Sequence, residues 1–228
     1  MATFLLRLAA PLQSWGADSK FETRKTNREP TKSGVIGLLA AALGLRRDDT
    51  AGLARLNSLR FAVRADREGS LLVDFHTANR EEDRKKGKAP YVTYRHYLQD
   101  AVFLVGLESE DTALLQVLET ALKHPAYPLY LGRRSCPPTL PLCLGTRAGE
   151  LLDTLRTEPL LVQKTSVDTL RIVADADPAD AAAAPRCDLP VSFSPVHRQY
   201  GFRPVREWNT KRPAMPGQTE HDAMAELR

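Results

Sequence analysis

The spacing of apolar and polar residues divides the start of the chain into a buried strand, a long polar loop and a helix. Residues 3–10 are apolar except for Arg7, which predicts a strand that is covered on both faces. Residues 18–32 are polar, rich in cations and without a period, so they predict a long loop. From Pro30 onward, apolar residues recur every three or four positions, and Gly44 is placed to end the predicted helix.

Further strands and helices follow as far as residue 144. The pattern predicts a helix at 51–59, strands at 60–65 and 71–75 joined by a turn at 68–70, strands at 91–97 and 101–107, a helix at 111–124 and a short apolar run at 140–144. Strand, helix, strand, strand, helix, strand is the order of a ferredoxin-like (RRM-like) unit. We therefore predict an α+β fold in which residues 1–146 form this unit, with a charged, protruding insertion at about 76–97.

The composition changes after Gly145, and we expect residues 147–210 to form a small C-terminal region. Its predicted parts are a strand at 165–173, an alanine-rich surface loop at 175–185 and a cation-containing segment at 200–208. The last residues, 211–228, are polar and interrupted by proline and glycine, which predicts a disordered tail.

Composition excludes several classes of protein. The longest apolar run, residues 35–45, is too short to cross a bilayer, and the N-terminal residues lack the pattern of a signal peptide. The three cysteines form no C-x-x-C pair, which argues against a zinc ribbon or a disulfide framework and favours a reducing compartment. We therefore expect a soluble cytoplasmic protein without membrane contact and without a metal or other cofactor.

The net charge of +4 is modest, but it is unevenly distributed. Residues 1–100 carry a net charge of +6, and the remaining residues carry −2. Arginine, which binds phosphate in a forked geometry and stacks on bases, supplies most of the cations. An arginine- and alanine-rich composition is also what a GC-rich coding sequence yields, so the position of the cations says more than their number.

Three basic clusters have the composition of RNA-binding segments. The first is the loop with Arg24 and Arg28 that leads into a helix N-terminus, a natural seat for phosphate, at Thr31, Lys32, Ser33 and Gly34. The second mixes the cations Lys86, Lys88 and Arg95 with the aromatic residues Tyr94 and Tyr97, and the third is Gly132, Arg133, Arg134 and Ser135. Each cluster alone is more typical of a solvated charged loop, and the pair Gly34 and Gly37 alone is more typical of close helix packing than of phosphate binding. Three clusters in one chain favour RNA.

Motifs of known enzymes are absent. The chain contains no Walker A, G-x-G-x-x-G, G-x-S-x-G or H-E-x-x-H sequence, and its histidines are not spaced as metal ligands. Metal-independent cleavage of RNA stays open as an alternative, because His96 lies among Tyr94, Arg95 and Tyr97. In a strand, however, His96 points to the side opposite Arg95 and Tyr97, so a binding or packing role is favoured.

Several longer segments together resemble a known family. They are L-R-L-A-A-P-L-Q-S-W-G (6–16), P-T-K-S-G-V-I-G-L-L-A-A-A-L-G (30–44) with R-R-D-D after Leu45, D-F-H-T-A (74–78), Y-R-H-Y-L-Q-D-A (94–101), Y-L-G-R-R-S-C-P (130–137) and R-E-W (206–208). In this order they resemble the CasD-type proteins of the RAMP superfamily, which belong to subtype e of the Cas "five" family. These are the subunits of type I-E CRISPR surveillance complexes (Cascade) that hold the 5′ handle of the guide RNA (crRNA).

The resemblance implies an RRM-like domain with a β-hairpin "thumb" at about 76–97 and a small C-terminal β-rich part. It implies a non-catalytic subunit of an antiviral complex that clamps the crRNA 5′ handle and joins the repeated backbone subunit to the large PAM-recognising subunit. It also adds Gln13 and Trp15 to the expected RNA contacts, although Trp15 is equally suited to a core. In a sister subtype the equivalent protein is itself an endoribonuclease, and that subtype's catalytic set has no clear counterpart here.

Overall fold

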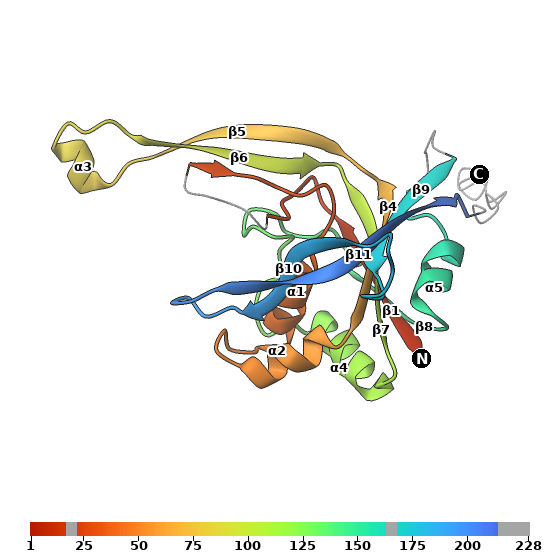
Figure 1. Cartoon of the computed structure of the whole chain (residues 1–228). Helices are drawn as coiled ribbons and strands as arrows, with labels where there is room; N and C mark the ends of the chain where they lie inside the picture. The colour runs from red at the N-terminus through yellow and green to blue at the C-terminus, as the bar shows by residue number, and fades with distance from the viewer. Residues whose placement is uncertain (17–21, 163–167, 214–228) are drawn as a thin grey trace, which may run out of the picture.

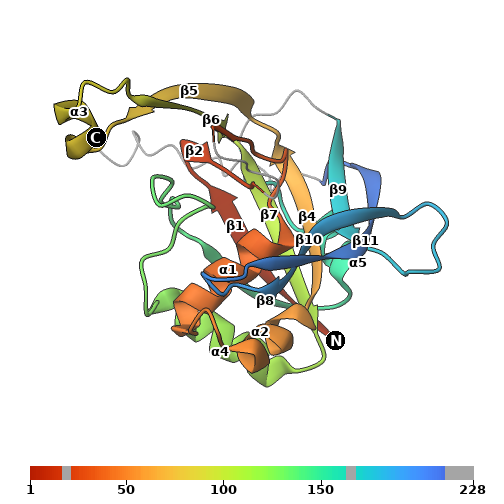
Figure 2. The same cartoon turned by 60° about the vertical axis from the view of Figure 1, so that its left-hand side comes forward.

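The computed structural model describes residues 1–16, 22–162 and 168–213. Its main feature is a seven-stranded sheet in which neighbouring strands are antiparallel (Figures 1 and 2). In spatial order the strands are β10 (Ala184–Ser192), β11 (Gln199–Lys211), β9 (Thr169–Asp175), β4 (Arg60–Arg67), β7 (Val102–Ser109), β1 (Ala2–Ala9) and β8 (Cys143–Ala148). The protein is therefore a mixed structure of helices and antiparallel strands, in agreement with the predicted α+β class.

Helices cover both faces of this sheet (Figure 1). One face carries α1 (Lys32–Leu43), α2 (Thr50–Asn57) and α4 (Thr112–Lys123), and the other carries α5 (Leu151–Thr157). The first three agree with the predicted helices to within a few residues. The short helix α5 has no strong pattern in the sequence and was not predicted.

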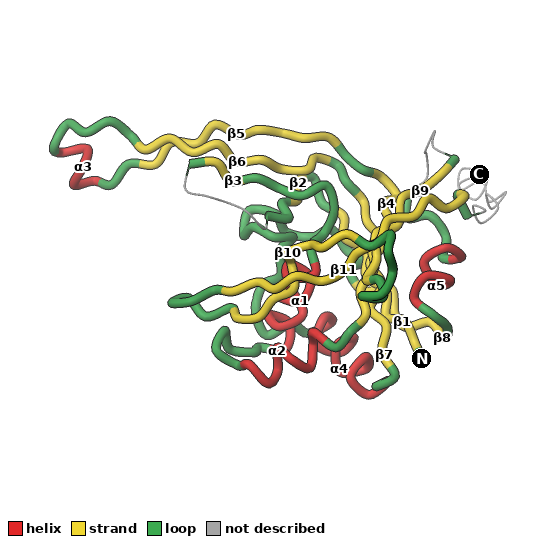
Figure 3. Tube along the Cα trace, in the orientation of Figure 1, coloured by secondary structure: helices red, strands yellow, loops and turns green. Residues whose placement is uncertain are grey.

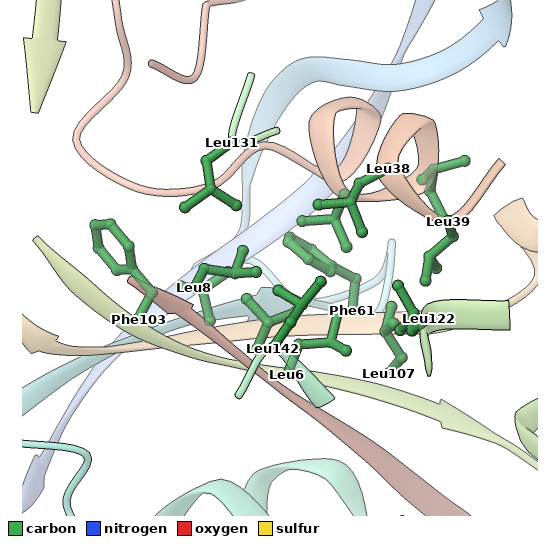
Figure 4. Close-up of a cluster of buried hydrophobic side chains, with 14 of the residues drawn as sticks. Leu6, Leu8, Leu38, Leu39, Phe61, Phe103, Leu107, Leu122, Leu131 and Leu142 are labelled. Carbon is green, nitrogen blue, oxygen red and sulfur yellow. The ribbon is translucent and has the colours of Figure 1, made fainter. Parts of the chain in front are cut away.

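The main hydrophobic core lies between the sheet and the helices α1, α2 and α4. Leu6 and Leu8 of β1 point toward Leu38 and Leu39 of α1, and Leu131 and Leu142 close the same cluster from the loops around it (Figure 4). Because successive residues of a strand face opposite sides, Leu5 belongs instead to a second cluster, beneath α5. This two-sided burial explains why residues 3–10 are apolar at nearly every position.

Helix α1 begins and ends where the sequence predicts. The Thr31 hydroxyl accepts a hydrogen bond from the Gly34 N–H and caps the first turn. At the other end, Gly44 has a φ of 74°, a left-handed conformation that glycine adopts without strain, and its N–H closes the last turn.

A second, smaller sheet is dominated by a long hairpin. Its two strands are β5 (Ser70–Ala78) and β6 (Tyr91–Gln99), and a short helix, α3 (Glu81–Lys85), lies at the tip, far from the helices of the core (Figure 3). The short strands β2 (Leu12–Gln13) and β3 (Thr23–Arg24) pair with the other edge of β6. We call residues 70–99 the long hairpin.

The predicted strands at 60–65 and 71–75 are present as β4 and β5, joined by a turn at Gly69, but they belong to different sheets: β4 pairs with β7 and β9, whereas β5 pairs with β6. The region predicted at 147–210 contains the strands β9, β10 and β11, and β9 is hydrogen-bonded to β4 so that these strands extend the large sheet. The beginning of the predicted strand at 165–173, part of the basic loop and most of the tail lie outside the described residues.

Candidate nucleic-acid interface

A large cleft opens beside α1. Its walls are the exposed side of α1, the loop at residues 127–137 and the turn at residues 193–200 that joins β10 to β11, and its volume is about 1530 Å³. The side of α1 that faces the cleft carries the small residues Gly34, Gly37 and Ala41, and the ring of Phe193 lies over Gly37. We call this space the basic cleft, because of the charges described next.

The charge of the basic cleft is strongly one-sided. Among the described residues, its lining contains a single acidic residue, Asp48, and seven cations: Arg24, Lys25, Arg46, Arg47, Arg133, Arg134 and Arg198. Asp48 is itself paired with Arg46, with 3.1 Å between Oδ1 and Nε, and this hydrogen bond lowers the pKa of the carboxyl group and raises the pKa of the guanidinium. The cleft thus concentrates positive charge in a protein whose net charge is only +4.

The loop at residues 132–135 is held in place by its backbone. Gly132 has a φ of 86°, and a Cβ atom at this position would lie 1.6 Å from the Ser14 carbonyl oxygen. Nη2 of Arg133 donates to the Arg24 carbonyl oxygen at 2.7 Å, and its guanidinium stacks on the ring of Tyr97, 4.6 Å from the centroid. Arg134 is exposed and lines the cleft. Of the two arginines, Arg133 therefore orders the loop and Arg134 faces solvent.

The predicted phosphate seat at the start of α1 needs correction. A buried carboxylate already occupies it: Oδ2 of Asp188 accepts from the Lys32 backbone N–H at 3.0 Å, and Thr31 caps Gly34. The Lys32 ammonium is also buried, and it donates to the Leu59 carbonyl oxygen at 2.8 Å and to Asp175 at 2.9 Å. Lys32 is therefore part of the fold, while Thr31, Ser33 and Gly34 only contribute to the wall of the cleft.

Three other predicted contacts are also buried. The Gln13 amide nitrogen donates to the Leu8 and Ala101 carbonyl oxygens, and its Oε1 accepts from Nε1 of Trp15 at 3.0 Å. Gln13 is fully buried, Trp15 is 1% exposed and Tyr97 is 5% exposed. Their burial leaves these side chains little surface for RNA, although Trp15 still borders the cleft.

Other predicted residues lie away from the cleft. Lys86 and Lys88 are at the tip of the long hairpin, where Lys88 pairs with Asp83 at 2.9 Å. Arg28 is exposed and approaches Glu68, with 3.8 Å between Nη2 and Oε2. Ser135 borders the cleft loop, and its hydroxyl lies 3.9 Å from the thiol sulfur of Cys136. The predicted contacts that the structure brings together around the cleft are Trp15, Arg24, Thr31, Ser33, Gly34, Gly132, Arg133 and Arg134.

The two faces of the long hairpin differ. Arg95 and the buried Tyr97 share one face, and Arg95 is in register with Arg24 of β3. On the other face, Leu71, Val73 and Phe75 of β5 are 52–62% exposed, and the ring of Phe75 meets Tyr94 edge-on at 5.7 Å. Tyr94 therefore belongs to an exposed apolar stripe, not to the basic cleft.

Several cleft residues were missed by the sequence reasoning. Arg46 and Arg47 lie just after the end of α1 and line the cleft. Their R-R-D-D motif contributes to the family resemblance but by itself does not predict an RNA contact. Arg198, Tyr127 and Tyr130 also line the cleft. No local sequence signal identifies Arg198 as a cleft residue. Its position beside α1 depends on how β10 and β11, which are far from α1 in the sequence, join the large sheet.

The described residues offer little for catalysis. Within them, no group of three His, Cys, Asp or Glu side chains is arranged to hold a metal ion. His96 is half-buried on the long hairpin, and Tyr97 points to the opposite face of β6. Nor does the described part of the chain contain a helix with the length and hydrophobicity that a membrane span requires.

A family model described as CRISPR-associated protein (Cas_Cas5) matches residues 3–206 of this chain, which includes every wall of the basic cleft. The chain belongs to the Cas5 family. A relative in this family, the CRISPR system Cascade subunit CasD of Escherichia coli (strain K12), is 47% identical over 156 residues. The matched part covers 62% of this chain and 70% of the relative.

Two solved structures of CRISPR-associated proteins are similar to this Cas5 protein over almost its whole length. A chain in a structure described as "CRISPR RNA-guided surveillance complex" superposes with a TM-score of 0.80 at 35% identity, and the match covers 99% of this chain and 97% of that one. A second structure, described as "Crystal structure of Cas protein", has a TM-score of 0.74 at 39% identity and covers 94% of this chain and 99% of that one.

Proposed function

We propose that this protein is the crRNA-binding subunit of a type I-E CRISPR surveillance complex (Cascade) in the cytoplasm, and that it clamps the 5′ handle of the guide RNA in the basic cleft. The observation that carries the proposal is the cleft itself, whose lining, in the part of the chain that the structure describes, has seven cations and one acidic residue; the chain is similar to a Cascade subunit. The protein acts as a structural, non-catalytic component of antiviral defence.

The chemistry of the cleft fits single-stranded RNA. Guanidinium groups of Arg24, Arg134 and Arg198 supply cations for successive phosphates. The rings of Tyr127 and Tyr130 line the same space and offer surfaces on which unpaired bases can stack. The bases of a double helix are already stacked and have no use for these rings, so a short unpaired segment such as the handle suits the site better.

The finer features of the predicted fold belong to the same proposal. The order β4-β7-β1-β8, with a helix after β1 and after β7, supports the ferredoxin-like unit. The long hairpin corresponds to the thumb, and its exposed apolar stripe supports contact with a protein partner. We assign the partners accordingly: the crRNA 5′ handle in the cleft, and the repeated backbone subunit and the large PAM-recognising subunit on other faces.

The nuclease alternative lacks a site in the described residues. General acid–base cleavage of RNA needs a base, an acid and a cation within reach of one phosphate. His96 lies on the hairpin face with Val73 and Tyr94, whereas the cations of the cleft lie elsewhere. We therefore propose that the protein protects and positions the handle without cutting it.

Binding of the full-length chain to its own handle RNA tests the proposal. We expect tighter binding of the handle than of a scrambled RNA of equal length, and affinity that falls as salt rises, because phosphate contacts release counterions. The same RNA embedded in its full repeat, incubated in EDTA, should stay intact. Equal affinity for both RNAs would contradict handle recognition, and a product cut at the handle boundary would restore the nuclease alternative.

A further inference from the structure

A closed ring of charged groups is buried behind the basic cleft. Asp188 accepts from Arg203 through both carboxylate oxygens, at 2.6 Å from Nε and 2.9 Å from Nη2, and from the Lys32 backbone N–H. Nη1 of Arg203 donates to Oδ1 of Asp175 at 2.5 Å, and Oδ2 of Asp175 accepts from the Lys32 ammonium at 2.9 Å. The ring contains two cations and two anions, so its formal charges cancel.

The ring joins elements that are far apart in the sequence. Lys32 begins α1, Asp175 ends β9, and Asp188 and Arg203 come from the two strands of the β10–β11 hairpin, where Arg203 is in register with Arg186 and Asp188 lies at a register shift. The same hairpin ends in the turn at residues 193–200, which forms one wall of the basic cleft, while α1 forms another. The ring therefore ties the β10–β11 hairpin to the start of α1 through buried hydrogen bonds, in addition to the contact of Phe193 with Gly37.

We propose that Asp188 and Arg203 are positioning residues for RNA binding, because they hold the β10–β11 turn against α1 and so set the width of the basic cleft. This inference rests on the proposed function. The carboxylate of Asp188 takes the place at the helix N-terminus that a phosphate could otherwise fill, so the RNA is directed to the open side of α1.

The ring is suited to this task by its burial. Asp188 is 0% exposed and Arg203 is 5% exposed, and hydrogen bonds to the two carboxylates raise the pKa of the guanidinium against the opposing effect of burial. Removal of one charge leaves its partner buried without compensation, which is strongly unfavourable and is relieved when the hairpin moves away from α1. We therefore expect that loss of one charge from the ring moves the β10–β11 turn and changes the width of the basic cleft.

A second buried ion pair provides a matched control. Arg64 and Asp66 are both fully buried, with 2.6 Å between Nε and Oδ1, and Arg64 also donates to the carbonyl oxygens of Glu158 and Pro159 on the other face of the sheet. Neither residue lines the basic cleft. Asp66→Asn removes one buried charge in the same way as Asp188→Asn, but far from the proposed RNA site.

The experiment compares the full-length wild type, Asp188→Asn and Asp66→Asn. Each is titrated with the same synthetic 5′ handle RNA at a temperature at which circular dichroism shows all three to be folded. We expect both variants to have a lower Tm. We expect Asp188→Asn to raise the Kd about tenfold and Asp66→Asn to change it less than about twofold. Hydrogen exchange at residues 193–200 should accelerate in Asp188→Asn only.

Each outcome decides between the roles. If Asp188→Asn binds the RNA as tightly as Asp66→Asn, or if its turn exchanges no faster, the ring is only structural and the inference is overturned. If Asp188→Asn fails to fold, Arg203→Lys, which keeps the cation, is measured in its place against the same criteria. A wild type that does not bind the handle overturns the proposed function itself. That outcome is distinct from Asp188→Asn binding as tightly as Asp66→Asn, which overturns only the inference about the ring.

Discussion

Gly132 lies directly against the backbone of Ser14: a Cβ atom added to this glycine would be 1.6 Å from the Ser14 carbonyl oxygen. The positive φ of 86° adds a second constraint. We therefore predict that Gly132→Ala lowers the free energy of unfolding by more than about 2 kcal/mol, because strain and a clash with backbone act together. The loop is expected to move, and handle RNA is expected to bind more weakly.

Gly87 supplies the control for this prediction. Its φ of 67° is also left-handed, but a Cβ atom there would meet nothing within 4 Å. Gly87→Ala should therefore show the conformational strain alone, about 1 kcal/mol, and leave RNA affinity unchanged. Denaturant unfolding and RNA titration of both variants measure the difference, and equal losses of stability would contradict the role of the Ser14 contact.

Arg134 and Arg133 are neighbours with different surroundings, so their substitutions should separate binding from stability. Arg134 is exposed in the cleft wall, whereas Arg133 holds the Arg24 carbonyl oxygen and stacks on Tyr97. We predict that Arg134→Ala weakens RNA binding several-fold, reduces the slope of log affinity against log salt by about 0.7, and leaves Tm unchanged. Arg133→Ala should lower both affinity and Tm.

Arg156 on α5 serves as the comparison for the charge change alone, because it is exposed, pairs with Asp153 at 3.3 Å and lies outside the cleft. Arg156→Ala should leave the salt slope as it is in the wild type. A slope that falls equally for Arg134→Ala and Arg156→Ala would mean that RNA senses only the net charge of the protein.

The apolar stripe of the long hairpin should matter for assembly and not for RNA. Leu71 and Phe75 are 62% and 59% exposed and point to the side away from Tyr97. We predict that Leu71→Ser/Phe75→Ser leaves handle affinity intact but lowers the yield of reconstituted complex, because the apolar area is no longer buried by a partner. Size-exclusion chromatography of the reconstitution measures this yield.

Val117 on α4 is a comparable exposed apolar residue away from the hairpin. Val117→Ser is expected to assemble like the wild type. Equal assembly by the hairpin double variant would show that the stripe is not a partner surface.

Local signals predicted local structure well in this chain. The capping threonine, the apolar spacing and the terminal glycine place α1 within two residues of its observed bounds, because a helix is determined by neighbours in sequence. The glycine and two arginines at residues 132–134 are visible without any tertiary information, and the structure places them in the lining of the cleft, while their contact with RNA stays a prediction.

Long-range contacts account for what the sequence did not predict. The start of α1 has the composition of a phosphate site, but Asp188, 156 residues later in the chain, occupies it. Arg198 reaches the cleft only because β9 pairs with β4 and brings the C-terminal hairpin beside α1. The sequence thus pointed to the two walls formed by α1 and by residues 132–135. The third wall, at residues 193–200, depends on the topology of the large sheet.

Asp111 gives a prediction that depends on pH. It caps α4: its Oδ1 accepts from the Leu114 N–H at 2.9 Å, and its Oδ2 accepts from Arg55 at 3.0 Å. The Leu114 N–H, followed by Arg55, holds the pKa of this carboxyl group below its ordinary value of 3.8. A carboxyl group whose pKa is lower in the folded state stabilises the fold above the unfolded pKa, and this contribution is lost as the pH falls through the folded pKa.

Asp111→Asn keeps an oxygen to cap α4 but cannot ionise. The wild type should therefore have the higher Tm at neutral pH, and the gap between the two proteins should close as the pH is lowered from about 5 to about 2. The gap is expected to be small and to shrink in salt, because the carboxylate and Arg55 are both partly exposed. Thermal melts of both proteins across this range give the measurement. A gap that stays constant with pH would show that the charge of Asp111 contributes nothing, and that the cap acts through its hydrogen bond alone.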